Sequence, residues 1–291
     1  MTPEQLRIFV AVAESGHVTR AAGLLGMSQS AASAAIKALE LGSGVQLFNR
    51  VGRAIELSPT GRRFLPEAKA VLERIAVARH VLENASQTIA GSIAIAASQT
   101  IASYWLPRRL VAFHKAHPGV ELDVQIGNTR EAAQAVLTGA AEIGLVEGVV
   151  DEPALSQVQV GSDRLAVVVA PDHPWAARRR LAADELASSP WVLREPGSGT
   201  RSTLEEAVRQ AGADPDALPI AMTLPSNEAV LAAAEAGAGA TALSESVAYA
   251  SVAAGRLATA PFLLPERPFR LLRHKERYRS RAGDAFADLM R

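Results

Sequence analysis

The stretch VTRAAGLLGMSQSAASAAIKALE, residues 18–40, decides the fold of the N-terminal part of the chain. Apolar residues recur at helical spacing over residues 18–25, and Gly26 ends this first short helix. Ser28 is a typical N-cap for a second helix that runs to about residue 40. The apolar stripe of the second helix consists of Ala32, Ile36 and Leu39. Two helices joined by a short turn that contains glycine form a helix-turn-helix.

The segments on either side extend this motif. Residues 3–14 carry apolar side chains at helical spacing, which predicts a further helix before it. Residues 45–58 read VQLF, NRVGR and AIELS, which predicts a hairpin with a basic turn. A hairpin directly after a helix-turn-helix has the form of a wing.

A long helix is expected from about residue 60 to residue 87. Its apolar residues recur every seven positions, as in Ala68, Ile75 and Leu82, and such a stripe favours a partner helix. We therefore expect dimerisation through this helix. The alternative is an amphipathic helix that lies on its own domain, and Arg79 interrupts the stripe.

From Gly91 onward the pattern changes to strands that alternate with helices. This alternation implies an α/β body with mostly parallel sheets. The expected strands are SIAIAAS, VELDVQIG, EIGLVEG, RLAVVVA, WVLRE, IAMTL and ATALSE. The expected helices cover residues 100–116, 129–139, 182–187, 199–211 and 226–236.

The composition is that of a folded protein with two or three domains. The chain has 291 residues, of which 48% are hydrophobic and 21% charged, and it contains no cysteine, which excludes disulfides and thiol catalysis. No run approaches the roughly 18 apolar residues of a membrane span. MTPEQLRIFV lacks the pattern of a secretory signal, so we expect a cytoplasmic protein. Residues 1–90 hold ten Lys or Arg and seven acids in a chain of net charge zero, a mild bias toward nucleic acid.

The segments LRIFVAVAESGHVTRAAGLLGMSQSAASAAIKALE and GVQLFNRVGRAIELSPTG resemble the winged helix-turn-helix of LysR-type transcriptional regulators. The last 200 or so residues resemble the effector-binding domain of that family, which has two α/β lobes and is related in fold to periplasmic solute-binding proteins. Within the family, the segments IGNTREAAQAVLTGAAEIGLVEG, APDHPWA and WVLREPGSGTR are similar to the CysL/CbbR-like branch, which controls sulfur assimilation and carbon fixation genes.

The resemblance implies a domain organisation and a set of partners. We expect a winged helix-turn-helix over residues 1–59, a dimerising linker helix over 60–88 and an effector-binding domain over 89–291. Lobe I would comprise residues 89–162 and 268–291, and lobe II residues 163–267, with crossings near Gly161–Asp163 and Leu264–Pro268. The implied partners are double-stranded DNA, a second copy in a homodimer, a homotetramer built from two dimers, and RNA polymerase. Effector binding between the lobes would shift the linker helices and hence the DNA-binding heads.

The resemblance places the DNA contacts on the second helix of the motif, on the start of the first helix and on the wing. Gln29 suits an adenine edge, Ala31 a thymine methyl group and Lys37 a phosphate. The expected DNA-binding residues are Thr19, Arg20, Ser28, Gln29, Ser30, Ala31, Ser33, Lys37, Arg50 and Arg53. In isolation the same segment is an ordinary packed helix, and its context makes it a recognition helix.

The chain departs from the family pattern within this helix. The family often has a basic residue and Gln where Ala34 and Ala35 stand, so the contacts of those side chains are missing here. The run Leu41-Gly42-Ser43 replaces the usual two acids and a leucine before Gly44. Because glycine costs about 1 kcal/mol inside a helix, we expect the helix to be least regular at this end.

Four segments place small polar residues where a strand ends and a helix begins. Ligands of open α/β sheets bind at such strand ends, and the free N–H groups of helix N-termini attract anions. We therefore expect a small anionic effector, such as a carboxylate, sulfate, sulfite or sugar phosphate. The expected effector-binding residues are Ser98, Gln99, Thr100, Asn128, Thr129, Glu147, Gly199, Thr200, Arg201, Ser226 and Asn227. The alternatives are that each Ser or Thr caps a helix and that Arg201 pairs with Glu205.

No catalytic or metal-binding pattern is evident in the sequence. Gly197-Ser198-Gly199 is not a nucleophile elbow, and EAGAGAT has the wrong order for a dinucleotide loop. His114 and His117 stand at a helix end, where solvated histidines are common. We therefore expect no enzyme, no metal and no cofactor. The rival functions are an enzyme that uses the cleft and a solute-binding protein with an N-terminal interaction module that does not bind DNA, which the missing export signal disfavours.

Overall fold

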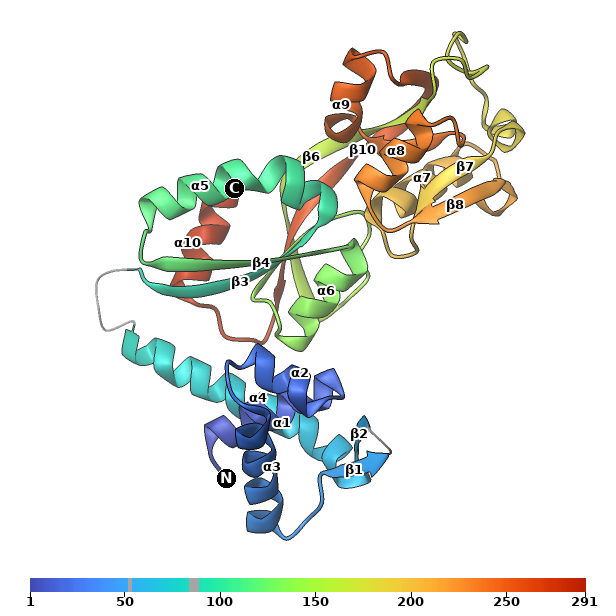
Figure 1. Cartoon of the computed structure of the whole chain (residues 1–291). Coiled ribbons are helices and arrows are strands. Elements are labelled where there is room, and N and C mark those ends of the chain that lie inside the picture. The colour runs from blue at the N-terminus through green and yellow to red at the C-terminus, as the bar shows by residue number, and fades with distance from the viewer. Residues whose placement is uncertain (52–53, 84–88) are drawn as a thin grey trace. The chain divides into compact units, whose positions relative to one another are not determined.

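The computed structural model describes residues 1–51, 54–83 and 89–291. The chain divides into two compact units, Met1–Ser86 and Gln87–Arg291. Figure 1 shows that the first unit is mainly helical and that the second is built from sheets flanked by helices. None of the helices within the described ranges is long and apolar enough to cross a membrane.

The first unit is a helix-turn-helix followed by a wing and a long helix. Its elements are α1 (Pro3–Ser15), α2 (Val18–Leu24), α3 (Gln29–Ser43), β1 (Phe48–Val51), β2 (Ala54–Leu57) and α4 (Pro59–Glu83). Thr2 and Gln5 form a capping box that starts α1, and Gly16 ends it with a φ of 65°. β1 and β2 pair antiparallel, with Phe48 opposite Leu57. The predicted motif and wing are confirmed.

The core of this unit gathers the apolar faces of all four helices. Phe9 of α1 is fully buried, and its ring centroid lies 5.3 Å from that of Phe48 and 5.1 Å from that of Phe64. These aromatic contacts join α1 to the wing and to α4. The predicted stripe of α3 faces the same core, because Ala32, Ile36 and Leu39 are all buried.

The expectation of an irregular end to α3 is wrong. The helix continues through Gly42 to Ser43 and ends at Gly44, which has a φ of 69°. The Ser43 hydroxyl donates to the carbonyl of Leu39 at 2.8 Å, and the Glu40 carboxylate accepts the N–H of Leu47 at 2.7 Å. The first bond lies within the last turn and the second ties this turn to the chain that follows, and together they offset the low helix propensity of glycine.

The first half of α4 packs on its own unit. Ala68 is fully buried, Phe64 and Leu72 pack against the same core, and Lys69 forms an ion pair with Glu14 of α1 at 2.7 Å. The intramolecular alternative therefore accounts for the apolar stripe of this half. Val71, seven residues after Phe64 and therefore in the same row of α4, is nevertheless 40% exposed.

The second unit contains two groups of strands and helices. Its strands are β3 (Gly91–Ser98), β4 (Val120–Gly127), β5 (Ile143–Glu147), β6 (Leu155–Val169), β7 (Trp191–Arg194), β8 (Ile220–Leu224), β9 (Thr241–Ser244) and β10 (Ala258–His274). Its α-helices are α5 (Leu106–Ala116), α6 (Thr129–Thr138), α7 (Gly199–Gln210), α8 (Asn227–Glu235), α9 (Glu245–Ala253) and α10 (Arg281–Met290). Shorter helical segments are Ile101–Trp105, Ala183–Ser188 and Pro215–Ala217.

The main sheet is mixed, so the expectation of mostly parallel sheets is wrong. Its strand order is β4-β3-β5-β10-β6-β9. β3 runs parallel to β4 and β5, whereas β10 is antiparallel to both β5 and β6, and β6 is antiparallel to β9. β7 and β8 form a separate parallel pair.

The sequence analysis did not predict α9, α10 or the strand β10. The sequence of β10 gives a reason. Its segment ATAPFLLPERPFRLLRH holds three prolines, which argue against a central strand because proline cannot donate to the ladder. The pairing with β6 shifts register between Thr259 and Leu263 and again between Leu263 and Glu266. Pro261 and Pro265 stand at these two irregularities, where a missing N–H does the least harm.

β6 and β10 run through both lobes of this unit and join them (Figure 1). Lobe I, around β3, β4 and β5, has a core that includes Phe113 and Phe286. Lobe II, around β7 and β9, has a core that includes Trp175 and Trp191. In the ladder Asp163 pairs with Arg267, so the two expected crossings lie opposite each other.

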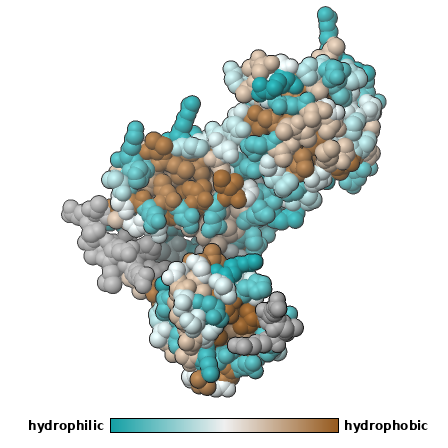
Figure 2. All heavy atoms as spheres, in the orientation of Figure 1, coloured by the Kyte–Doolittle hydropathy of each residue, from teal (hydrophilic) through white to brown (hydrophobic). Residues whose placement is uncertain are grey.

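Apolar side chains also remain on the surface of the second unit. Figure 2 shows brown areas on both of its lobes on the face turned to the viewer. Val111 of α5 is 56% exposed, and Ile126 of β4, at the edge of the main sheet, is 60% exposed.

Candidate functional site

The recognition helix presents its first turn to solvent. The side chain of Ser28 accepts the N–H of Ala31 at 3.2 Å, so this residue is the N-cap as well as an expected DNA contact. Gln29 donates to the Ser33 hydroxyl at 3.0 Å, and Ser33 is half-buried. The exposed members of the expected DNA-binding set are Thr19, Arg20, Ser28, Gln29, Ser30, Ala31 and Lys37.

Two basic residues of this surface, Arg20 and Lys37, are free to meet phosphate. Within the described ranges, neither Arg20 nor Lys37 has a carboxylate partner, and both are exposed. Arg50 lies in β1, opposite Ile55 of β2. Arg53 falls outside the described residues. Unpaired cations at the start of α2 and along α3 suit the phosphate contacts that position a helix in a groove.

A cluster of buried polar side chains lies where the two lobes meet. Five of the expected effector-binding residues belong to it, and each is at most 3% exposed. They are Ser98, Thr100, Glu147, Thr200 and Asn227. The prediction that the strand-end segments converge therefore agrees with the structure, but their polar atoms bind one another.

Arg267 of β10 is the centre of this cluster, and sequence reasoning did not find it. Its guanidinium binds both carboxylate oxygens of Asp163, at 2.5 Å and 2.8 Å. One nitrogen also donates to the Thr200 hydroxyl at 3.2 Å and lies 3.6 Å from a Glu147 oxygen. The other Glu147 oxygen accepts the hydroxyl of Ser98. One buried cation thus faces two buried carboxylates.

Arg194 of β7 forms a second buried centre that sequence reasoning also missed. It binds the Glu195 carboxylate through two nitrogens, at 2.8 Å and 3.0 Å, and donates to the amide oxygen of Asn227. Asn227 in turn donates to Thr100 at 3.1 Å, and its backbone N–H donates to Gln99 at 2.6 Å. Asn227 therefore links lobe II to lobe I.

The Glu195 carboxyl stays ionised in this setting. Burial alone would raise its pKa, but the hydrogen bonds from Arg194, from its own backbone and from Asn128 together hold the pKa below the ordinary value. Asn128, which lies in lobe I, reaches Glu195 of lobe II at 3.2 Å. This charged contact adds to the bonds that hold the lobes together.

Gly199 allows the lobes to touch backbone to backbone. A Cβ at this position would lie 2.1 Å from the carbonyl oxygen of Glu147 and 2.7 Å from the Thr129 hydroxyl. That hydroxyl donates to the same carbonyl at 2.6 Å. Any larger residue at the start of α7 would therefore keep this end of the helix away from β5.

Three other expected residues have structural roles, and the alternative interpretations describe those of Ser226 and Arg201. Ser226 caps α8 by accepting the N–H of Ala229 at 3.0 Å. Asn128 forms the capping box of α6. Arg201 pairs with Glu205 at 2.7 Å and also donates to the Arg194 carbonyl at 3.2 Å.

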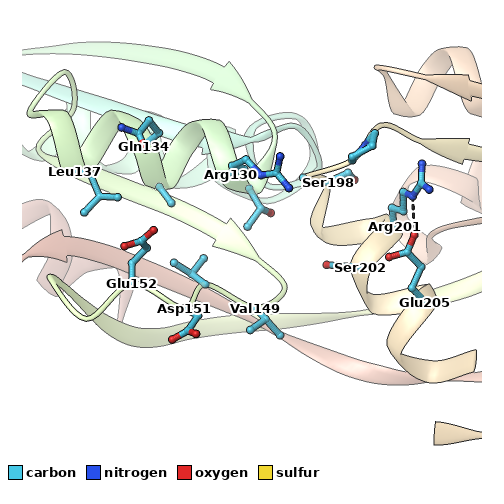
Figure 3. A pocket seen from close by; sticks show the side chains of 15 residues that line it. Arg130, Gln134, Leu137, Val149, Asp151, Glu152, Ser198, Arg201, Ser202 and Glu205 are labelled. Carbon is cyan, nitrogen blue, oxygen red and sulfur yellow. Dashed lines mark hydrogen bonds and ion pairs between the residues drawn. The ribbon is translucent and has the colours of Figure 1, made fainter. Parts of the chain in front are cut away.

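A pocket of about 370 Å³ adjoins the cluster, between α6 of lobe I and α7 of lobe II (Figure 3). Thr129 and Arg201 are the two expected residues in its wall. Arg130, which was not expected, is exposed there and has no carboxylate partner within the part of the chain that the structure describes. The wall consists of Thr129, Arg130, Ala133, Gln134, Leu137, Val149, Val150, Asp151, Glu152, Pro196, Gly197, Ser198, Arg201, Ser202 and Glu205.

Fold and site together define a class of protein. A winged helix-turn-helix with an exposed recognition helix, followed by two α/β lobes with a polar cluster at their junction, is the design of a DNA-binding regulator that responds to a ligand. Two family models match the chain. "Bacterial regulatory helix-turn-helix protein, lysR family" covers residues 3–62, and "LysR substrate binding domain" covers residues 86–291. The chain belongs to the LysR family of transcriptional regulators.

Similar proteins agree with this assignment. The regulator YeiE of Escherichia coli K12 is 34% identical over 299 residues, which span 99% of this chain and 96% of that protein. CysL of Bacillus subtilis is 35% identical over 83% of this chain and 80% of its own, and the RuBisCO operon transcriptional regulator of Allochromatium vinosum is 32% identical over 82% and 78%. The structure of full-length CbnR complexed with target DNA has 25% identity and a TM-score of 0.68, and covers 100% of this chain and 99% of that chain.

These relatives settle the function at the level of the family. The chain is a DNA-binding transcriptional regulator with an effector-binding domain, and it is not an enzyme. The rival interpretations, a solute-binding protein without DNA binding and an enzyme that uses the cleft, are thereby set aside. The presence of CysL and a RuBisCO operon regulator among the relatives confirms the expected CysL/CbbR-like branch.

Proposed function

We propose that the effector is a small anion that binds at the junction of the lobes in place of the Glu147 carboxylate. The observation that carries this proposal is the burial of that carboxylate, 3% exposed, against the Ser98 hydroxyl and the Arg267 guanidinium. A hydroxyl, a guanidinium and the N-terminal turn of α7 are the surroundings that an anionic ligand prefers. Glu147 acts as an internal ligand of the site.

The charge balance requires that Glu147 leave when an anion arrives. Arg267 carries one positive charge, whereas Asp163 and Glu147 carry two negative charges when ionised. Another anion next to both carboxylates would be repelled. Once Glu147 swings out, an effector oxyanion can accept bonds from Ser98, Thr200 and Arg267.

This exchange couples binding to the angle between the lobes. Thr200 belongs to lobe II and Ser98 to lobe I, so an effector held by both bridges the junction. Gly148 follows the last residue of β5 and lies against Gly199, where a Cβ on Gly148 would be 2.9 Å from the Cα of Gly199. This contact changes when Glu147 and the end of β5 move. The effector shifts the population of lobe arrangements only by as much as its affinity for them differs. The pocket between α6 and α7 is the entry route in this proposal.

We propose that the DNA surface works as the sequence indicates. Gln29 and the serines of the first turn of α3 read base edges, and Arg20, Lys37 and the wing arginines Arg50 and Arg53 contact phosphate. The proposed domain boundaries are 1–59, 60–88 and 89–291, with lobe II at 163–267.

The proposed assembly is a homodimer through the linker helix and a homotetramer built from two dimers. The exposed apolar residues Val71 of α4 and Val111 of α5 supply surface for such contacts. RNA polymerase is a proposed further partner. A regulator of chromosomal promoters works where the DNA is, so we propose a cytoplasmic location.

The effector proposal is tested by thermal unfolding of the full chain with sulfate, sulfite, small carboxylates and sugar phosphates. A ligand at 100 times its dissociation constant stabilises the folded protein by about 2.7 kcal/mol. Glu147→Gln keeps the size of the side chain and removes its charge, so it should bind the same anion more tightly than the wild type does. Glu152→Gln, an exposed residue of the pocket wall, is the matched control and should leave the affinity unchanged.

Two outcomes would contradict the proposal. Equal affinity of the wild type and Glu147→Gln for every anion that binds would show that the carboxylate does not compete. A shift caused only by cationic or neutral compounds would show that the site is not an anion site.

A further inference from the structure

The recognition helix α3 carries two rows of side chains outside its buried stripe. Helix residues that are three, four or seven positions apart lie on one face. The polar row consists of Ser30, Ser33 and Lys37, and the apolar row, displaced by one residue, consists of Ala31, Ala34 and Ala38. All three alanines of the apolar row are exposed. The methyl groups of this row have no packing partner that would explain them as part of the core.

The polar groups at the start of α3 are bonded to one another. Gln29 donates to the Ser33 hydroxyl at 3.0 Å, and the hydroxyl oxygens of Ser28 and Ser30 are also 3.0 Å apart. A base edge would have to replace these bonds, so the net gain from each new hydrogen bond is small. Lys37, which has no carboxylate partner in the described ranges, stands beside the apolar row and suits a phosphate.

DNA is the ligand of this helix, because the chain belongs to a family of DNA-binding regulators. The bases present hydrogen-bond donors and acceptors in the major groove, and the apolar group among these features is the C5 methyl group of thymine. Ala31 and Ala38 are seven residues apart, which is about 10 Å along the helix axis and equals the rise of about three base pairs. The apolar row is therefore long enough to meet more than one base.

Alanine also permits a close approach. Its side chain is a single carbon, so it does not hold the helix away from the floor of the groove as a longer side chain would. Two methyl groups in contact, about 4 Å apart, are both removed from water. Contacts of this kind need no hydrogen bond to be exchanged.

We propose that the apolar row of α3 reads thymine methyl groups, and that Ala34 and Ala38 determine specificity together with Ala31. The inference rests on the proposed placement of the start of α3 in the major groove. The preferred DNA sequence then holds thymines at fixed positions that no hydrogen bond from the protein selects. Burial of one methyl-sized group corresponds to a change in affinity of about fourfold.

The test replaces thymine with uracil, which pairs with adenine in the same way and lacks only the C5 methyl group. A preferred sequence for the full-length chain is first selected from random double-stranded DNA. Each selected thymine is then replaced by uracil in turn, and the affinity is measured by fluorescence anisotropy. At least two of these replacements should each weaken binding about fourfold. Uracil outside the selected sequence should have no effect.

Two variants assign the effect to the apolar row. Ala34→Gly and Ala38→Gly each remove one methyl group, so each should bring the ratio of the thymine and uracil affinities to about one at one position. A loss of helix stability affects both DNAs equally and cancels in this ratio. Ala250→Gly makes the same change at an exposed position of α9, in the second unit, and should keep the ratios of the wild type at every position.

Three results would overturn the proposal. They are a selected sequence without thymine, equal affinity for thymine and uracil at every selected position, and wild-type ratios in both Ala34→Gly and Ala38→Gly. Gln29→Ala, measured on thymine DNA, tests the proposed function separately. An unchanged sequence preference of that variant contradicts base reading by Gln29, whereas the uracil ratios decide the role of the apolar row.

Discussion

A pocket of about 150 Å³ lies beside the last turn of α3, and a single substitution can fill it. Ser43 lines this pocket together with the apolar side chains of Leu39, Leu47 and Phe64. The family usually has a leucine before the glycine that ends this helix, and Ser43 leaves that space open. We expect Ser43→Leu to stabilise the DNA-binding unit, because the added carbons would contact side chains that already belong to the core or border it.

The size of the effect follows from the atoms exchanged. Leucine replaces one hydroxyl with three carbons, worth about 2.4 kcal/mol if each were fully buried. The pocket is open to solvent on one side, which leaves roughly half of this, about 1.2 kcal/mol. Loss of the hydrogen bond from the Ser43 hydroxyl to Leu39 costs about 0.5 kcal/mol. The higher helix propensity of leucine adds a few tenths of a kcal/mol of stability. The net gain is about 1 kcal/mol.

Hydrogen exchange on the full chain measures this gain in stability for the DNA-binding unit separately from the rest of the protein. All three tryptophans and all three tyrosines of the sequence follow residue 100, so aromatic fluorescence does not report on the first unit. A stabilisation of 1 kcal/mol should slow exchange of the most protected amides of α1 and α3 about fivefold.

Ser43→Ala is the control, because it removes the hydroxyl without filling the pocket. Exchange in Ser43→Ala should be as fast as in the wild type or slightly faster. If Ser43→Leu protects these amides no better than Ser43→Ala does, the pocket does not accept the side chain and the reasoning from its volume is refuted.

Other predictions concern DNA and pH. Gln29→Ala should relax sequence preference in operator titrations, whereas Lys37→Ala should weaken binding to all sequences and lower the salt slope by about 1, and the opposite pattern would exchange the two roles. Burial lowers the pKa of His173 below 6.5 although Asp172 acts to raise it, so the unfolded chain takes up the proton first. Stability should be complete above pH 6.5 and decrease as the pH falls from there to the folded-state pKa. His173→Gln should remove this decrease in stability, whereas His114→Gln, at an exposed histidine, should keep it. If the wild type and both variants show the same pH dependence of unfolding, His173 is not its cause.

The parts of the fold that the sequence predicts are those governed by neighbours in the chain. Ser28 caps α3 through a bond to Ala31, three residues on, and Ser98 and Thr200 each stand where a strand gives way to a helix, a change that the neighbouring sequence indicates. By contrast, Arg267 and its partner Asp163 are 104 residues apart. A charged residue between two prolines gives no local sign of such a partner.

Long-range contacts also explain the two wrong predictions about the fold, the irregular end of α3 and the mostly parallel sheets. The end of α3 depends on Glu40, whose carboxylate reaches the N–H groups of Leu47 and Phe48, and that contact exists only once the wing has folded. β10 depends on pairing with β6 through both lobes, which outweighs the proline signal. In the candidate site, the strand-end positions were predictable, but their mutual hydrogen bonding was not.

The paired strands β6 and β10 limit how the lobes can move. Each backbone is already extended, so this two-stranded tether cannot lengthen without breaking its ladder. It is pliable only where its pairing is irregular, and one such break, between Phe269 and Arg270, lies next to the crossing at Arg267. Any rotation of one lobe relative to the other would therefore take place about the crossing of β6 and β10. A rotation about Arg267 would displace β4, at the edge of the main sheet, further than the buried polar cluster beside Arg267, because displacement grows with distance from the axis.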